Sequence, residues 1–167
     1  MEISGRADTR AERFMIRLGA TFFFTGHFPI APATFASFVT LLLWWRLPPI
    51  SAPAMLWTLL ILALYGTYVA GRAEAIYGHD GKPIVIDEVV GALLTVAFLG
   101  PAVEEHRLKL AIAGFLLFRV LDVVKPPPAY QLQSLPGGFG VMADDVMAAV
   151  YGNCLLRLVH LLRPGWI

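Results

Sequence analysis

The stretch FRVLDVVKPPPAYQLQSLPGGFGVMADD, residues 118–145, sets charged side chains among segments that are otherwise nearly free of charge. The charged residues are Arg119, Asp122, Lys125, Asp144 and Asp145. An ionisable group inside a membrane costs about 2.5–3.5 kcal/mol on insertion scales, so such groups are usually kept for a function. This stretch therefore predicts the functional site around which the chain is organised.

The first half of the stretch predicts a charged helix end. Arg119, Asp122 and Lys125 are three residues apart, so they share one helix face. The prolines at 126–128 end that helix directly afterwards. The cationic and acidic groups are therefore expected where a helix stops.

The second half predicts an anion-binding loop followed by a helix. Gly138 and Gly140 belong to a glycine-rich segment that is expected to be a flexible loop able to approach an anion closely. Asp144 and Asp145 then begin another apolar segment. Together the two halves indicate a site for phosphate and a metal ion, and the simpler alternative is a polar loop with an ordinary acidic helix start.

The composition is that of a membrane protein. The 167 residues have room for a single domain, and 57% of them are hydrophobic, with a mean hydropathy of +0.68. The net charge of +1 makes nucleic acid an unexpected partner. Cys154 is the single cysteine of the sequence, so no disulfide framework is expected.

The amino-terminal residues 1–17 carry a basic stripe. Their arginines recur at offsets of four, three and four, on one side of a helix: Arg6, Arg10, Arg13 and Arg17. Such a helix suits the surface of a membrane with anionic lipids, and a solvated charged face is the alternative. Residues 18–33 are uncharged but broken by Gly26, Pro29 and Pro32, which favours a shallow or re-entrant segment.

Apolar segments predict the other helices of an all-α, polytopic membrane bundle formed by one domain, residues 1–167. They are expected at about 34–47, 55–70, 89–103, 108–124 and 144–162. Two apolar segments separate each polar stretch from the next, so 71–88 and 125–143 are expected on the same side as the amino terminus. That side carries eight Lys and Arg against five on the other, which makes it the cytoplasmic face, with the site facing the cytoplasm.

Two of these helices are predicted to meet through small residues. Each helix has a stripe of four residues, at a first position and then three, four and seven residues further on. One stripe is Glu88, Gly91, Ala92 and Thr95, and the other is Asp145, Ala148, Ala149 and Gly152. Small residues let helices approach closely in lipid, and Val96 is expected on the opposite, lipid-facing side. The stripes would bring two pairs of acids together. The alternative is that the stripes only pack and the acids only favour the helix starts.

The converging acids predict a metal site. They are Asp87 with Glu88, and Asp144 with Asp145. Such carboxylates repel one another unless a cation lies among them, and an all-oxygen set favours Mg²⁺ or Mn²⁺. A divalent ion near Arg119 and Lys125 suits a phosphate ester, since the ion polarises the phosphoryl group and the cations balance developing charge. His79 and Asp80 are either a proton relay or a pair in a turn.

Three blocks of sequence resemble the phosphatidylglycerophosphatase A family of bacterial inner-membrane lipid phosphatases. They are FTGHFPIAPATFAS at 24–37, HDGKPIVIDEVVGALLT at 79–95, and FRVLDVVKPPP with PGGFGVMADDVMAA within 118–149. The last two are specific in order and spacing. In the first block Ala33 and Ala36 stand where the family usually has glycines, while Thr34 and Ser37 remain as hydroxyl donors.

The resemblance implies an enzyme of the bacterial inner membrane that uses Mg²⁺ to remove the phosphate of phosphatidylglycerophosphate, giving phosphatidylglycerol. Its catalytic acids would be Asp87, Glu88, Asp122, Asp144 and Asp145, and all of these except Asp122 are expected metal ligands. The expected phosphate-binding residues are Thr34, Ser37, His79, Arg119, Lys125, Gly138 and Gly140. Membrane lipids are the other expected contacts, and self-association into a homo-oligomer is left open.

Other classes of membrane protein share some of these features. CDP-alcohol phosphotransferases also use clustered aspartates with Mg²⁺, but the motif that they require does not follow Asp80-Gly81. A divalent-cation or proton-coupled transporter would also hold intramembrane acids, but here each acid pair is expected at the start of an apolar segment. A membrane scaffold would explain the small-residue stripes and leave the charged face at 119–125 unexplained.

Overall fold

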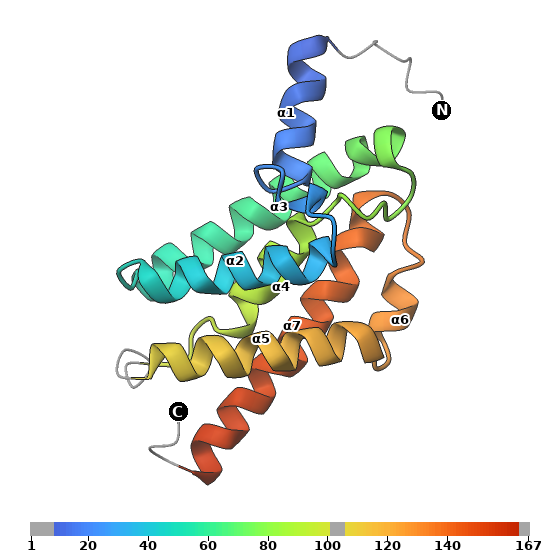
Figure 1. The fold of residues 1–167 in the computed structure, drawn as a ribbon. Coiled ribbons are helices and arrows are strands. Elements are labelled where there is room, and N and C mark those ends of the chain that lie inside the picture. The colour runs from blue at the N-terminus through green and yellow to red at the C-terminus, as the bar shows by residue number, and fades with distance from the viewer. Residues whose placement is uncertain (1–8, 101–105, 164–167) are drawn as a thin grey trace.

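The computed structural model describes residues 9–100 and 106–163, and its fold is all-α, as predicted (Figure 1). The described part contains seven α-helices and one short 3-10 helix, η1. Their bounds are α1 Arg10–Ala20, η1 Thr25–His27, α2 Pro32–Arg46, α3 Ala52–Tyr77, α4 Ile86–Thr95, α5 Arg107–Val124, α6 Ala129–Leu132 and α7 Gly138–Leu162. The helices α4 and α7 form the most extensive pair, and α2, α3 and α5 pack around them.

Of the helices in the described ranges, α3 and α7 are long and apolar enough to cross a membrane. They contain 26 and 25 residues. At a rise of 1.5 Å per residue each is about 38 Å long, which exceeds the hydrocarbon thickness of about 30 Å.

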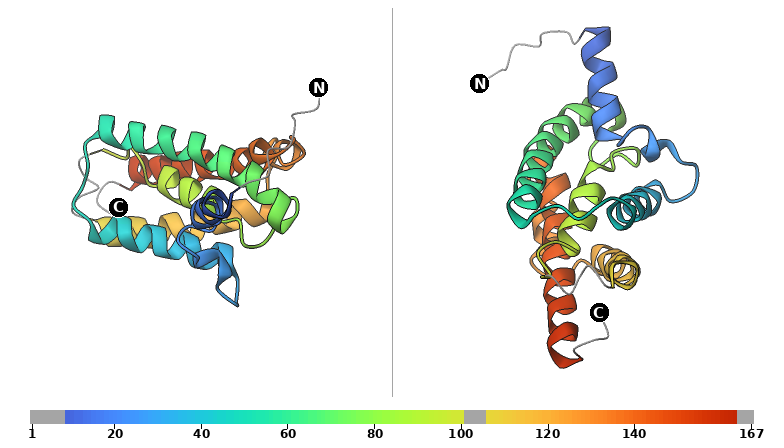
Figure 2. Two further views of the ribbon diagram at one scale, coloured as in Figure 1. Left: turned by 90° about the horizontal axis from the view of Figure 1, so that it is seen from above. Right: turned by 90° about the vertical axis from the view of Figure 1, so that its left-hand side faces the viewer.

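The helix ends gather at two sides of the bundle. The turn between α2 and α3 lies beside the start of α5, on the left of Figure 1. The end of α3, the end of α5, α6 and the start of α7 lie on the opposite side, and Figure 2 shows the same separation from above. Segments 71–88 and 125–143 are therefore on one side of the bundle, as their spacing along the chain predicts.

The two small-residue stripes meet, as predicted. A Cβ atom on Gly91 would lie 3.3 Å from the carbonyl oxygen of Asp145, so α4 and α7 approach closely there. A Cβ atom on Gly152 would lie 3.0 Å from the methyl group of Thr95. Larger side chains at these positions would push the two helices apart.

A leucine at position 91 is expected to lower stability and activity together. A Cβ atom there would already lie 2.4 Å from the Phe118 ring, and overpacking of this kind typically costs about 1–3 kcal/mol. Gly91→Leu should therefore melt at a lower temperature than the wild type in the same detergent. The control Val150→Phe enlarges a side chain that is 40% exposed on α7, and it should melt normally. Wild-type melting of Gly91→Leu would mean that neither Phe118 of α5 nor α7 packs closely against this glycine.

The prediction that Val96 faces lipid is wrong. This residue is only 2% exposed. A Cβ atom on Gly114 of α5 would lie 2.5 Å from the Val96 side chain, so the valine fills the space that this glycine leaves. The outer side of α4 is covered because the short helix lies inside the bundle.

The helix α4 is shorter than the one predicted over 89–103. The side chain of Asn153 on α7 donates hydrogen bonds to the carbonyl oxygens of Leu94, Thr95 and Ala97 at 3.2, 3.0 and 2.8 Å. In a longer helix, such carbonyl oxygens would accept hydrogen bonds from the backbone of the next turn. Here they accept hydrogen bonds from α7, and α4 ends. With ten residues α4 is about 15 Å long, half of what a membrane span needs.

The helix α7 starts earlier than predicted. It begins at Gly138 and not at Asp144, so the prediction of a flexible glycine loop is wrong. A Cβ atom on Gly138 would lie 1.9 Å from the carbonyl oxygen of Thr67 on α3. A Cβ atom on Gly140 would lie 2.2 Å from that of Leu135. Close backbone packing therefore accounts for both glycines, and Asp144 lies inside the helix.

The helix α1 carries part of the predicted basic stripe and projects from the bundle (Figure 1). Its arginines are Arg10, Arg13 and Arg17. Arg6 lies outside the described residues, as do Glu104 and Glu105 of the predicted turn at 104–109. Ile16 and Ala20 are buried and anchor α1 against the core next to α3.

Candidate functional site

Four acids of the predicted site come together where α4 begins beside α7. Asp87 and Glu88 lie in the first turn of α4, and Asp144 and Asp145 lie on α7. Each is buried, with 4–7% of the residue exposed. The Asp145 carboxylate interacts electrostatically with Glu88 and Asp87, so the packing of α4 on α7 joins the two acid pairs into one cluster.

Arg119 on α5 connects carboxylates of two helices. Its guanidinium forms ion pairs with Glu88 of α4 and, at 3.3 Å, with Asp122 one turn further along α5. The hydroxyl of Ser37 on α2 donates a hydrogen bond of 2.9 Å to the same glutamate. Glu88 is thereby held by side chains from two other helices.

Lys125 connects the end of α5 to α7. Its backbone is left-handed, with φ of 46°, and this residue ends the helix. Its ammonium group donates a hydrogen bond of 2.6 Å to Oδ2 of Asp144. Burial by itself lowers the pKa of Lys125, but the hydrogen bond and the ion pair with Asp144 outweigh it and raise the pKa above the usual 10.5. Lys125 is therefore a permanent cation at physiological pH.

The acidic cluster contains more carboxylates than paired cations. Its acids are Asp87, Glu88, Asp122, Asp144 and Asp145, and in the described ranges their ion pairs are those with Arg119 and Lys125. Oδ1 of Asp144 and Oδ2 of Asp145 are buried without a hydrogen-bond partner. Burial, together with repulsion from Glu88, raises the pKa of Asp87 well above its usual value. The cluster is thus short of positive charge.

The oxygen atoms of this cluster suit a hard divalent cation. Among residues 9–100 and 106–163, no group of three His, Cys, Asp or Glu side chains is arranged so that it could hold a metal ion as it is. Glu88 and Asp144 are directed at Arg119 and Lys125. The two unpartnered buried oxygens and the wholly carboxylate donor set nevertheless match the ligands that Mg²⁺ takes in proteins.

Among the described residues, Thr34 and His79 are predicted phosphate-binding residues that form no hydrogen bond or ion pair with the acids of the cluster. Thr34 lies three residues before Ser37, on the same face of α2. His79 is exposed, and its Nδ1 lies 2.5 Å from a carboxylate oxygen of Glu74 at the end of α3. The histidine is therefore paired with Glu74 of α3.

Asp80, which the sequence left as either part of a proton relay or a turn residue, lies near the acidic cluster. It interacts electrostatically with Asp87 and with Asp144, and its carboxylate accepts a hydrogen bond of 3.3 Å from Gln133. Its φ of 49° is unusual for a residue other than glycine. The dipeptide Asp80-Gly81 signalled a turn, but nothing in the sequence indicated that this turn covers the cluster.

Comparison with known proteins identifies the family. The sequence profile of the phosphatidylglycerophosphatase A family matches residues 18–160. A protein of Bacteroides thetaiotaomicron, provisionally named phosphatidylinositol-3-phosphatase, is 33% identical over 155 residues, which cover 88% of this chain and 94% of the relative. Phosphatidylglycerophosphatase A of Escherichia coli is 30% identical over 141 residues, or 82% of this chain and 78% of the relative.

A further relative matches over a shorter length. Phosphatidylglycerophosphatase A of Haemophilus influenzae is 40% identical over 90 residues, which are 53% of each chain. No solved structure matches this chain. The family profile includes every helix that contributes to the acidic cluster. The chain therefore belongs to the phosphatidylglycerophosphatase A family of lipid phosphatases.

Proposed function

We propose that this protein hydrolyses the phosphate monoester of phosphatidylglycerophosphate to phosphatidylglycerol and inorganic phosphate, with Mg²⁺ as its cofactor. The observation that carries the proposal is the buried acidic cluster with Arg119 and Lys125 beside it. Metal-assisted hydrolysis of a phosphate ester uses both kinds of group, because oxygen ligands bind a divalent cation and the positive side chains bind phosphate. The family membership of the chain supports the same reaction class.

Asp87, Glu88, Asp144 and Asp145 are the proposed ligands of the cation. When bound, Mg²⁺ would polarise the phosphoryl group and lower the pKa of the attacking water. The unpartnered oxygens of Asp144 and Asp145 are available to it as donors. Arg119 keeps Glu88 oriented toward the cluster, and Asp122 keeps Arg119 in place.

Lys125 is the proposed cation for the phosphate group. It is paired with Asp144 and partly exposed, so it is able to contact a phosphate that enters from the side of the bundle where α5 ends. Ser37 has a positioning role, because its hydroxyl is bonded to Glu88. Thr34, one turn earlier on α2, offers a further hydroxyl.

Release of inorganic phosphate by the purified protein tests this function. In detergent, the protein should release phosphate from phosphatidylglycerophosphate with Mg²⁺ present and stop when the cation is chelated. Chelation should also lower the melting temperature, because a ligand that binds only the folded state stabilises it. A folded protein whose melting responds to Mg²⁺ but which releases no phosphate from any lipid phosphate ester would instead support the transporter.

Phosphatidylinositol 3-phosphate is the second substrate to compare. The relative from Bacteroides thetaiotaomicron, whose provisional name gives this substrate, aligns with 88% of the chain. Both lipids carry a phosphate monoester on a glycerophospholipid, so the acidic cluster serves either. We expect a higher kcat/KM for phosphatidylglycerophosphate. The reverse order of the two kcat/KM values would reassign the substrate and leave the chemistry of the cluster unchanged.

We also propose that the protein is a multi-pass protein of the bacterial inner membrane with the acidic cluster at the cytoplasmic side. The two long apolar helices and the gathering of helix ends at two sides support this. In a Cys154→Ser background, Lys82→Cys and Gln133→Cys should react with an impermeant maleimide only from the cytoplasmic side. Ser51→Cys, in the turn between α2 and α3, should react from the other side. Labelling of all three from one side would contradict the topology.

A further inference from the structure

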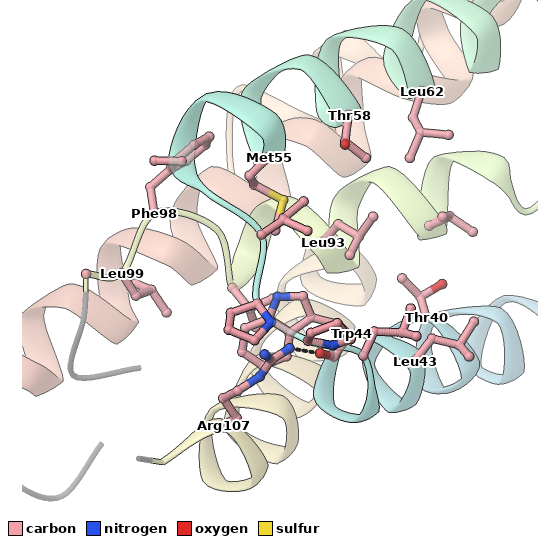
Figure 3. A pocket seen from close by; sticks show the side chains of 18 of the residues that line it. Thr40, Leu43, Trp44, Met55, Thr58, Leu62, Leu93, Phe98, Leu99 and Arg107 are labelled. Atoms are coloured by element: carbon pink, nitrogen blue, oxygen red, sulfur yellow. Dashed lines mark hydrogen bonds between the residues drawn. The ribbon is translucent and has the colours of Figure 1, made fainter. Parts of the chain in front are cut away.

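A cavity of about 520 Å³ lies between α2, α3 and α4 (Figure 3). Its walls are almost wholly apolar, with Leu43 and Trp44 from α2, Met55 and Leu62 from α3, and Leu93 from α4. Its volume falls in the range of about 300–1,000 Å³ that is usual for small-molecule sites. The cavity is therefore large enough to hold part of a lipid.

The cavity exists because two consecutive helices are splayed apart. Among the described helices, α2 and α3 each pack against α4 and hardly touch each other, although only residues 47–51 join them. The two hydroxyl-bearing side chains in the wall, Thr40 and Thr58, donate their hydrogens to carbonyl groups of their own helices. The wall consequently offers few partners to water, which needs several hydrogen bonds to remain in a cavity.

Arg107 and Trp44 bound the cavity at the end remote from the acids (Figure 3). The guanidinium lies over the Trp44 ring, 4.6 Å from its centre, and donates a hydrogen bond to the Trp44 carbonyl oxygen. A cation stacked on an aromatic face is held by the charge distribution of the ring. The pair thus forms part of the cavity wall.

The other end of the cavity adjoins the acidic cluster. Ser37, which binds Glu88, is followed three residues later on the same face of α2 by Thr40 in the cavity wall. On α4, Val89 in the wall directly follows Glu88. One face of α2 therefore leads from the carboxylates into an apolar space within one helical turn.

We propose that this cavity holds an acyl chain of the lipid substrate while its phosphate lies at the acidic cluster. The inference rests on the proposed function, and it adds the part of the site that recognises the lipid tail. A polar group at one end and an apolar space leading away from it match the two parts of a phospholipid. An acyl chain is also the apolar group that a bilayer supplies to a gap between two of its helices.

Chain-length dependence tests this placement. The substrates are phosphatidylglycerophosphate with long acyl chains and its short-chain, water-soluble form. Thr58→Trp and Leu93→Trp each fill the cavity, and neither residue bonds to the acidic cluster. Both variants should lower kcat/KM for the long-chain substrate by about tenfold or more, as expected when about two methylene groups are no longer buried. Turnover of the short-chain form should stay near that of the wild type.

The matched control is Ile61→Trp, which adds the same side chain to the exposed side of α3 at a residue that is 62% exposed. Its kcat/KM for the long-chain substrate and its turnover of the short-chain form should both be near those of the wild type. Equal losses on both substrates in the filled variants, or no loss on either, would overturn the placement of the chain. An inactive wild type on both substrates would instead overturn the proposed function.

A binding measurement separates the cavity from the chemistry. A phosphatidylglycerol with a photoreactive group at the end of one acyl chain should label the segments of α2 and α4 that line the cavity. Thr58→Trp should remove this labelling and Ile61→Trp should keep it. Labelling that is unchanged by Thr58→Trp would mean that the chain lies outside the cavity, even in a fully active phosphatase.

Discussion

Asp145→Asn should lower kcat by about 10²-fold or more, the range seen when one electrostatic stabiliser is removed from an active site. Asp145 is 4% exposed, and its Oδ2 has no hydrogen-bond partner. The amide keeps the size of the side chain but removes the negative charge that a divalent cation requires. Because neighbouring carboxylates repel one another, the variant should melt no lower than the wild type without Mg²⁺ and should gain less stability when Mg²⁺ is added.

The same substitution outside the cluster provides the control. Glu12→Gln removes a carboxylate on α1 that lies 3.7 Å from Arg72, with the Glu12 side chain 44% exposed, so kcat should be unchanged. Phosphate release gives the activity, and melting over a Mg²⁺ titration gives the binding. Wild-type kcat and an unaltered Mg²⁺ response in Asp145→Asn would exclude this carboxylate from the metal site.

The features of this fold that depend on spacing could be predicted from the sequence. The small residues on the stripes of α4 and α7 recur at helical intervals, and interval alone determines which residues share a face. The same reasoning placed Arg119, Asp122 and Lys125 together, and the structure pairs them with one another or with acids of α4 and α7. In a regular helix, the sequence interval between two residues determines whether they lie on the same face.

Helix boundaries depend on tertiary contacts, which the spacing of residues along the sequence does not reveal. α4 stops because Asn153, nearly sixty residues later, binds its last carbonyl groups. α7 starts early because Gly138 allows its backbone to touch α3, whereas the glycines by themselves indicated a loop. The proximity of Asp80 to Asp87 and Asp144 is likewise a tertiary contact, which the spacing of residues along the chain does not reveal.

The cavity was beyond prediction for a related reason. An apolar hairpin of two helices predicts that they pack against each other, as α2 and α3 do not. Their separation depends on α4, a helix too short to cross a membrane, which lies between them and the rest of the bundle. The acidic cluster and the cavity thus both arise from the placement of α4, whose first turn carries two of the acids and whose later turns form the cavity wall.

Arg119→Leu should be the most destabilising change at the site, by about 3 kcal/mol or more, because removing one partner of a buried ion pair leaves the other charge unpaired. The guanidinium pairs with Glu88 and Asp122, and the side chains of Arg119 and Glu88 are 17% and 7% exposed. Phosphate release should also fall, since Glu88 would no longer be held. Arg46→Leu, at the exposed end of α2, is the control and should leave both properties near those of the wild type.

A double variant distinguishes this cause from general damage to the fold. If Arg119→Leu loses stability because the Glu88 carboxylate is left unpaired, then adding Glu88→Gln should recover part of that stability, because the amide removes the buried charge. Activity should remain low, because Glu88 is also a proposed metal ligand. Melting of the single and double variants in one detergent measures this coupling directly. A double variant less stable than Arg119→Leu would show that Arg119 stabilises the bundle by packing and not by neutralising Glu88.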